Sequence, residues 1–189
     1  DKYLDNIFAF QGVTVPPGGA TVDLGDVAVF RWFGKLENKV FYDANQNGFR
    51  DPGETYGMRD QAINLRFRDG SMYQTITTDV NGDAVLEEVF PFFNWLVAEV
   101  DYTRFKPTGA TVIVDNGGQV PAGGDLNPQV QAAVNPNTGS NLSRTETGPV
   151  LLEGMQLFLG QTNVIEWGKK DYAPGENGGI TGIVHYATT

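Results

Sequence analysis

The sequence predicts an all-β fold, a β-sandwich with additional strands and a long polar loop. The chain of 189 residues contains 24 glycines and 10 prolines, residues that form the turns between short strands. The segments between these turns are rich in β-branched and aromatic residues, which favour strands. No segment has the apolar spacing of a long amphipathic helix. The chain is long enough to bury a sizeable core.

Residues 1–33 precede the part of the chain with the clearest motif. They contain four apolar segments separated by turn residues, which predict three or four strands at residues 4–10, 13–15, 20–24 and 27–33. These strands either end a preceding module or add to the same sandwich. The sequence leaves both possibilities open.

Residues 34–106 predict one compact unit. Its strands are expected at residues 39–42, 63–68, 72–78, 84–89 and 95–100. Ile63, Leu65 and Phe67 alternate with polar residues, which is the pattern of a half-buried strand. We expect the aromatic corner at residues 90–94 to close one end of the sandwich.

The segment between residues 43 and 54 has the spacing of a twelve-residue calcium loop. Acidic or amide side chains occupy positions 1, 3, 5, 9 and 12, Gly48 permits the bend at position 6, and position 7 offers its carbonyl. Calcium takes about six to eight oxygen ligands, and magnesium seldom uses a full protein cage. A solvated turn would need only two or three such residues. We therefore predict Ca²⁺ bound by Asp43, Asn45, Asn47, the carbonyl of Phe49, Asp51 and Glu54.

The residues on either side of this loop are not those of an EF-hand, whose loop lies between two helices. Residues 39–42 are largely β-branched or aromatic and carry no helical stripe. Pro52, Gly53 and Gly57 would disrupt a helix on the other side. We therefore expect the calcium loop to join two strands.

Three stretches of residues 34–106 resemble the serine–aspartate-repeat B-type (SdrD B-like) domain, a Cna-B-like β-sandwich of the immunoglobulin or transthyretin type. In order they are VFYDANQNGFRDPGE, INL and TTDVNGDAVLEEV. The resemblance implies a calcium-stabilised extracellular module of a bacterial surface protein, often in tandem. It also implies that the metal ligands are Asp43, Asn45, Asn47, Asp51 and Glu54. The chain departs from the family at residues 56–60, where the link is longer, and after residue 110.

A second acidic turn follows at Asp79, Asn81 and Asp83, with Asp60 as a further candidate ligand. A second cation there is one interpretation. We favour a polar hairpin turn, because such residues fill turns for conformational reasons alone.

Residues 107–178 predict an extension with a long loop and further strands. Residues 115–149 have almost no large apolar side chains, and a long loop in a compact domain is usually functional or disordered. Within it, Asn127 and Pro128 predict the start of one short helix over residues 129–134. If the protein binds a host or matrix protein or a glycan, we expect this loop to make the contact, but the interpretation we favour is a surface loop without a partner.

The C-terminal part predicts strands at residues 150–159, 162–167 and 180–186. Residues 184–186 resemble residues 40–42, so residues 179–189 are interpreted as the first strand of a following repeat. In another register, residues 174–176 match residues 52–54, and the tail would be the second strand of that repeat. His185 is therefore expected to be a strand residue and not a catalyst or zinc ligand.

Composition argues against several classes of function. The 23 acidic residues outnumber the 13 basic ones and give a net charge of −10, which disfavours nucleic-acid binding. There is no cysteine for a disulfide or thiolate metal site, and no apolar run approaches the roughly 18 residues of a membrane span. The motifs G-x-S-x-G and H-E-x-x-H and the P-loop are also missing. We therefore expect no enzyme activity, no catalytic or cofactor-binding residues and no membrane insertion.

The chain begins at Asp1 without an initiator methionine or a signal peptide. We therefore expect a monomeric piece of a longer, multi-repeat polypeptide. The predicted function is a calcium-stabilised structural module of a secreted or cell-surface bacterial protein, which spaces or presents an adhesive region. The alternative is a module that binds a protein or glycan through residues 115–149.

Overall fold

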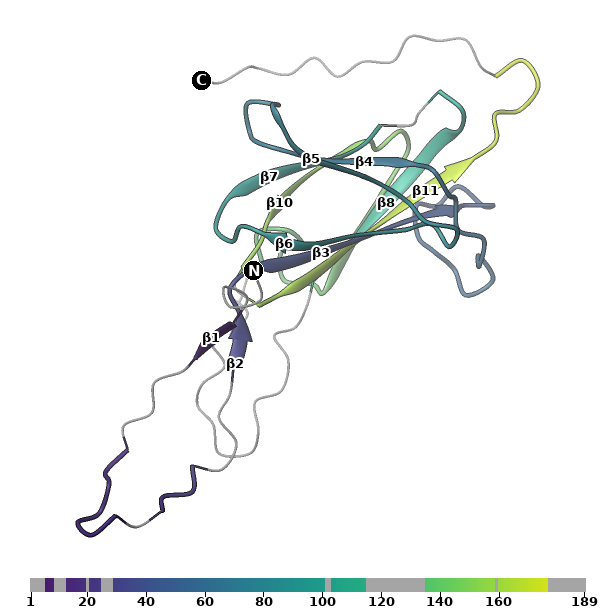
Figure 1. Cartoon of the computed structure of the whole chain (residues 1–189). Coiled ribbons are helices and arrows are strands. Elements are labelled where there is room, and N and C mark those ends of the chain that lie inside the picture. Colours follow the sequence, from purple (N-terminus) through teal and green to yellow (C-terminus); the bar gives the residue numbers. More distant parts are fainter. Residues whose placement is uncertain are drawn as a thin grey trace.

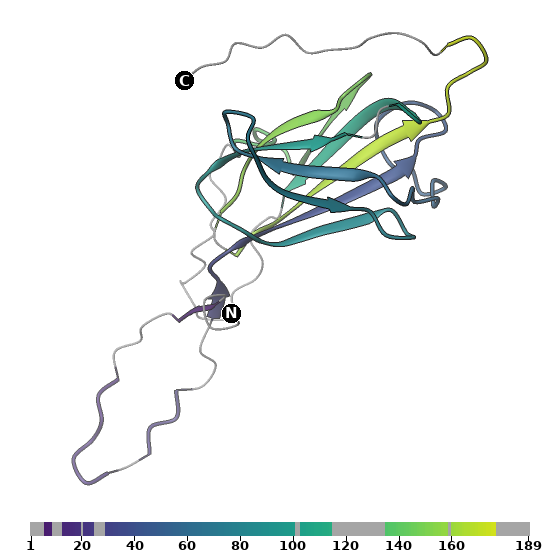
Figure 2. The ribbon, with the colours of Figure 1, turned by 45° about the horizontal axis from the view of Figure 1, so that its top comes forward.

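The computed structural model describes residues 6–8, 13–19, 21–24, 29–100, 103–114, 135–158 and 160–176. All regular elements in these ranges are β-strands, which form two large sheets and one separate strand pair (Figures 1 and 2). The predicted all-β sandwich is therefore confirmed. In this part of the chain no helix has the length and apolar character needed to cross a membrane. The helix predicted at residues 129–134 lies outside the described residues.

The larger sheet has five strands in the order β6-β3-β11-β8-β9. Neighbouring strands are antiparallel except for β3 and β11, which are parallel. The strands are β3 (Gly34–Tyr42), β6 (Asp83–Val89), β8 (Lys106–Val114), β9 (Ser143–Thr147) and β11 (Thr162–Lys170).

The smaller sheet has four antiparallel strands in the order β10-β7-β4-β5. They are β4 (Ala62–Arg66), β5 (Met72–Thr77), β7 (Asn94–Glu99) and β10 (Leu152–Gln156). The separate pair consists of β1 (Asn6–Phe8) and β2 (Val29–Arg31), which are antiparallel.

The strands predicted at residues 13–15 and 20–24 are not present in the described part of these segments. Val15 is 66 % exposed, so no neighbouring strand covers it. The turn between the segments begins with Pro16 and Pro17, which have no N–H to donate to a partner strand. Figure 1 shows these residues at the far end of an arm that extends away from the sandwich.

The core lies between the two sheets. Alternation along β3 buries Leu36 and Val40 completely and leaves Lys35, Glu37 and Lys39 partly exposed. Other strands and Leu157, which follows β10, contribute further large core side chains, among them Ile63, Leu65, Leu86, Trp95, Val97, Val112, Met155, Ile165 and Trp167. Both sheets therefore depend on the same buried apolar cluster.

Strands from two predicted segments share this core. β8, β9, β10 and β11 come almost entirely from the predicted extension at residues 107–178, and they complete both sheets of the predicted unit at residues 34–106. β11 separates β3 from β8 in the centre of the larger sheet. Residues 34–106 therefore do not form a core separate from the extension. The predicted repeat strand at residues 179–189 lies outside the described residues.

The aromatic corner between β6 and β7 closes the sandwich only in part. Phe90 packs against Phe33, with ring centroids 5.3 Å apart, and Phe93 packs against Trp95 at 5.7 Å. Phe90, Phe92 and Phe93 nevertheless remain 42 %, 57 % and 52 % exposed. The corner therefore covers the end of the core and also presents rings to solvent.

Candidate calcium loop

Residues 43–54 follow β3 directly and pack against β8, β9 and β11. The Thr111 hydroxyl on β8 donates to the Gly48 carbonyl oxygen at 2.7 Å. A Cβ atom on Gly109 would lie 2.6 Å from the Gly48 Cα, and one on Gly168 would lie 2.8 Å from Asp43 Oδ2. Glycine at these two strand positions therefore leaves room for the loop to contact the sheet.

Asp43 is completely buried beneath this loop. Its Oδ1 accepts the backbone N–H groups of Gln46 at 2.7 Å and Asn47 at 3.2 Å. Its Oδ2 accepts the Gly48 N–H at 2.9 Å and the Thr108 hydroxyl at 2.6 Å. A carboxylate offers about four acceptor sites, and in Asp43 all of them are used to hold the loop and β8 together.

The other predicted ligands lie within hydrogen-bonding reach of one another. Asn45 Nδ2 and Asn47 Nδ2 both donate to Asp51 Oδ2, at 2.7 and 2.9 Å. Glu54 accepts the Ala44 N–H at 2.7 Å and the Asp51 N–H at 3.0 Å. The loop therefore brings positions 3, 5 and 9 of the predicted calcium motif to one point, and position 12 closes its two ends.

The fit of these residues to calcium is partial. For a cation to bind beside Asp51, the side-chain amides of Asn45 and Asn47 would have to flip by about 180°, so that Oδ1 takes the place of Nδ2. Phe49 donates its N–H to Asn47 Oδ1 at 2.8 Å, which fixes the backbone around the predicted carbonyl ligand. In the described part of the chain, no three His, Cys, Asp or Glu side chains form a cluster that could hold a metal. A metal here would depend on amide and carbonyl oxygens as well as carboxylates.

Two side chains attach the outside of the loop to β11. Arg50 Nε lies 2.6 Å from Glu166 Oε1, and Glu166 is buried. Lys170 Nζ donates to the Ala44 carbonyl oxygen at 2.6 Å. The loop begins at the end of β3. It is therefore also fixed to β11, the parallel neighbour of β3.

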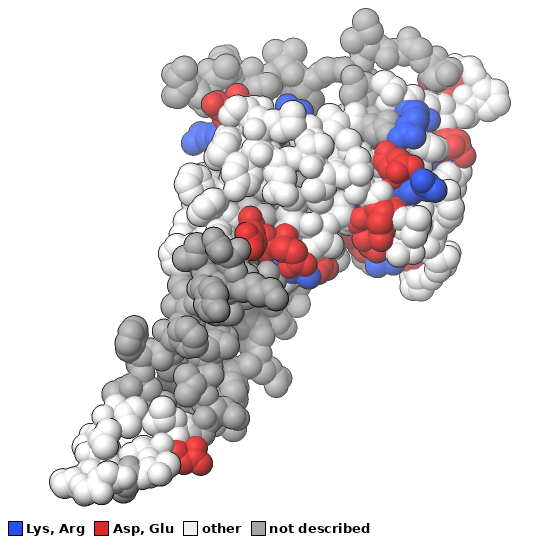
Figure 3. Space-filling model, in the orientation of Figure 1, with Lys and Arg blue, Asp and Glu red and all other residues white. Residues whose placement is uncertain are grey.

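The second acidic turn is a hydrogen-bonded turn. Asp79 Oδ1 accepts the backbone N–H groups of Asn81 at 2.8 Å and Asp83 at 2.9 Å, and these bonds lower the pKa of Asp79. Asp83 pairs with Lys39 at 2.9 Å, and Asp60 pairs with Arg59 at 2.8 Å. These acidic groups are therefore engaged by separate partners. Figure 3 likewise shows acidic and basic side chains close together on the visible face of the sandwich.

A buried ion pair next to the core was not predicted from the sequence. Lys169 Nζ lies 2.7 Å from Glu99 Oε2, and each side chain is only 1 % exposed. Lys169 also donates to Gln61 Oε1 at 2.9 Å. One sequence signal was available, because Lys169 continues the alternation of Ile165 and Trp167 on the inner face of β11. The pair joins the larger sheet to the smaller one.

A second buried carboxylate, Glu153 on β10, is 3 % exposed. Burial raises its pKa above the ordinary 4.5, although Arg144 Nη2 lies 2.6 Å from Glu153 Oε2 and opposes the shift. The folded protein therefore holds this proton more tightly than the unfolded chain does. The contribution of Glu153 to stability is largest below about pH 4.5 and is lost as the pH rises through the folded-state pKa.

Replacing Glu153 by glutamine is expected to remove this loss. The free energy of unfolding of the Glu153→Gln variant, relative to the unsubstituted chain, should rise between about pH 4.5 and neutral pH. Urea unfolding at several pH values measures the difference. Glu146→Gln is the matched control, because Glu146 also pairs with Arg144 but its side chain is 54 % exposed. A parallel pH dependence in both variants would contradict the prediction.

No protein-family model matches the sequence, and no curated protein matches it. The chain is similar to solved structures of two mutants of the major pilin from Streptococcus pyogenes, with 11 % and 9 % identity and a TM-score of 0.32 in both cases. The matches cover 82 % and 78 % of this chain and 53 % of each pilin chain, so this chain spans about half of that pilin's length. A TM-score this low supports no inference about function.

Proposed function

We propose that this chain is a calcium-stabilised structural module that carries tension in a secreted or cell-surface bacterial protein, where it spaces or presents an adhesive region. The observation that supports this most is the pairing of β3 with β11. In the part of the chain that the structure describes, they are the first and last strands of the two large sheets, and they are parallel neighbours in the larger sheet.

Parallel pairing determines how tension would act on the sandwich. The chain enters β3 at Gly34 and leaves β11 at Lys170, at opposite ends of the sheet (Figure 1). Eight residue pairs join the two strands, from Thr162↔Lys35 to Lys169↔Tyr42. Opposed pulling at these ends acts along the strands and loads their hydrogen bonds together. An antiparallel pair pulled at one end would instead open one bond at a time.

The calcium loop lies at the end of the sheet where β11 leaves. It begins immediately after β3, and it contacts β8 through Thr108 and β11 through Arg50 and Lys170. Calcium would be held by Asn45, Asn47, Asp51 and Glu54 with the Phe49 carbonyl, and Asp43 would support the loop from beneath. The ion would offset the repulsion between the loop carboxylates. Extracellular modules bind calcium with dissociation constants on the order of 10⁻⁴ to 10⁻³ M, so such a site would fill outside a cell.

Single-molecule pulling tests this proposal. The chain has no cysteine, so handles can be attached at introduced cysteines. We expect a several-fold higher unfolding force for the pair Lys35→Cys and Lys170→Cys, which loads β3 and β11 in shear, than for Lys35→Cys and Glu88→Cys. The second pair pulls at one end of the antiparallel β3–β6 pair, where Gly34 faces Val89. Equal forces in the two geometries would exclude a role for the parallel pair.

Pulling and thermal unfolding in millimolar calcium and in EDTA test whether calcium stabilises the module. Binding to the folded state alone adds about 1.4 kcal/mol of stability for each tenfold excess of calcium over its dissociation constant. We therefore expect a higher melting temperature and a higher shear force in calcium. Identical values in EDTA would remove calcium from the proposal and leave the mechanical part standing.

A further inference from the structure

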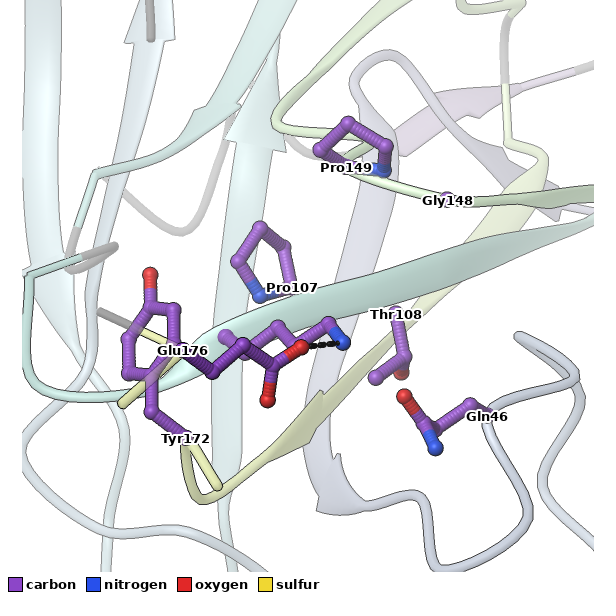
Figure 4. Close-up of a pocket in the computed structure, with 8 residues that line it drawn as sticks. Gln46, Pro107, Thr108, Gly148, Pro149, Tyr172 and Glu176 are labelled. Carbon is purple, nitrogen blue, oxygen red and sulfur yellow. Dashed lines mark hydrogen bonds and ion pairs between the residues drawn. The ribbon is translucent and has the colours of Figure 1, made fainter. Parts of the chain in front are cut away.

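A cavity of about 430 Å³ opens beside the calcium loop. Its lining comes from the loop, from the start of β8, from residues 148–149 and from residues 172–176 after β11 (Figure 4). Binding sites for small molecules are typically about 300–1,000 Å³ in volume. The cavity is therefore large enough for one sugar ring, and four separate segments of the chain build it.

Part of the cavity lining is apolar. Pro107 is buried on β8, Pro149 lies in the turn before β10, and Tyr172 is half-buried in the segment after β11. These three rings offer C–H and π surface, and among them only Tyr172 carries a hydrogen-bonding group, its hydroxyl. Such a surface suits the C–H face of a pyranose ring.

The polar groups come from Gln46, Lys106 and Glu176. Gln46 has a backbone φ of 61°, in the left-handed region that glycine occupies without strain. The chain nevertheless carries a side chain there, and Figure 4 shows its amide directed toward Thr108 at the cavity. A glutamine amide supplies both donors and an acceptor, which matches neighbouring hydroxyl groups.

The two charged groups neutralise each other. Lys106 at the start of β8 pairs with Glu176 (dashed line in Figure 4), and this hydrogen bond lowers the pKa of Glu176. An anionic ligand would compete with Glu176 for Lys106, and a cationic ligand would compete with Lys106 for Glu176. A neutral ligand can instead accept a hydrogen bond from the ammonium and donate one to the carboxylate without breaking the pair.

We propose that this cavity binds a neutral pyranose unit of a glycan. The ring stacks on Tyr172, and its hydroxyl groups bond to the Gln46 amide and to the Lys106–Glu176 pair. This site includes Gly148 and Pro149, at the end of the loop predicted at residues 115–149. It requires neither calcium nor tension, so its failure would leave the proposed structural function unaffected.

NMR titration of the 189-residue chain with neutral methyl glycosides of glucose, galactose, mannose and N-acetylglucosamine tests the proposal. We expect saturable shifts with at least one of them, with a dissociation constant on the order of 1 mM. Glucuronate and glucosamine, which carry a charge, should bind more weakly than the neutral sugar of the same ring. Saturable shifts with none of the neutral glycosides would overturn the proposal.

Gln46→Gly separates binding from folding. It removes the amide and suits the local backbone, so the melting temperature should stay within a few degrees while affinity falls at least about tenfold. Tyr172→Ala should abolish binding, and Tyr172→Phe should retain it because the ring remains. Tyr56→Ala is the control, since Tyr56 is 66 % exposed and does not line the cavity. Binding that is unchanged in Gln46→Gly and Tyr172→Ala would also overturn the proposal.

Discussion

Replacing Lys169 by methionine is expected to lower the free energy of unfolding by about 3–5 kcal/mol. Lys169 and Glu99 form an ion pair at 2.7 Å between side chains that are each 1 % exposed. Methionine fills a similar volume but leaves the Glu99 carboxylate buried without a counter-charge. Gln61 loses its lysine donor as well. The cost therefore comes from the charge that stays behind more than from the lost attraction.

Chemical denaturation of three variants separates these contributions. Lys169→Met combined with Glu99→Leu should recover most of the stability, because no unpaired charge remains in the core. Lys39→Met should cost less than about 1 kcal/mol, because the Lys39–Asp83 pair is partly exposed to solvent. Equal losses in Lys39→Met and Lys169→Met would show that burial of the Lys169 pair has no special cost.

Local patterns in the sequence predicted the elements of the sandwich better than their arrangement. Alternation identified β4, because the side-chain period of a strand is two residues, and β-branched and aromatic residues identified the end of β3. The parallel pairing of β3 with β11 leaves no such local signal. Parallel strands need a long connection, and here residues 43–161 separate the two strands. The partners of Lys169 were hidden for the same reason, since Gln61 and Glu99 lie far from it in sequence.

The calcium motif shows the same division between local and distant information. The spacing from Asp43 to Glu54 predicted which side chains turn inward, and Asn45, Asn47 and Asp51 do meet in the loop. The spacing carried no information about Thr108, whose hydroxyl reaches Asp43 from β8. It also gave no sign that Gly109 and Gly168 are needed to let the loop contact the sheet.

Because Asp43 also bonds to β8, which lies outside the motif, its substitution should have the second large effect on stability. Replacing Asp43 by alanine is expected to lower the free energy of unfolding by at least about 3 kcal/mol even in EDTA. The substitution leaves the backbone N–H groups of Gln46 and Gly48 and the Thr108 hydroxyl without their acceptor, whereas the Asn47 N–H keeps Asn45 Oδ1 at 3.1 Å. Each buried donor without a partner costs about 1–3 kcal/mol, although some of these groups can turn toward water when the loop relaxes.

Asp51→Ala is the matched substitution within the same loop. Asp51 is partly exposed, and its Oδ2 accepts bonds only from the amides of Asn45 and Asn47. We therefore expect Asp51→Ala to cost less than about 1 kcal/mol in EDTA and to remove whatever stabilisation calcium provides. Asp43→Ala should be destabilised with or without calcium. Denaturation of both variants in EDTA and in millimolar calcium distinguishes a carboxylate that supports the loop from one that binds the ion, and equal losses in EDTA would contradict the distinction.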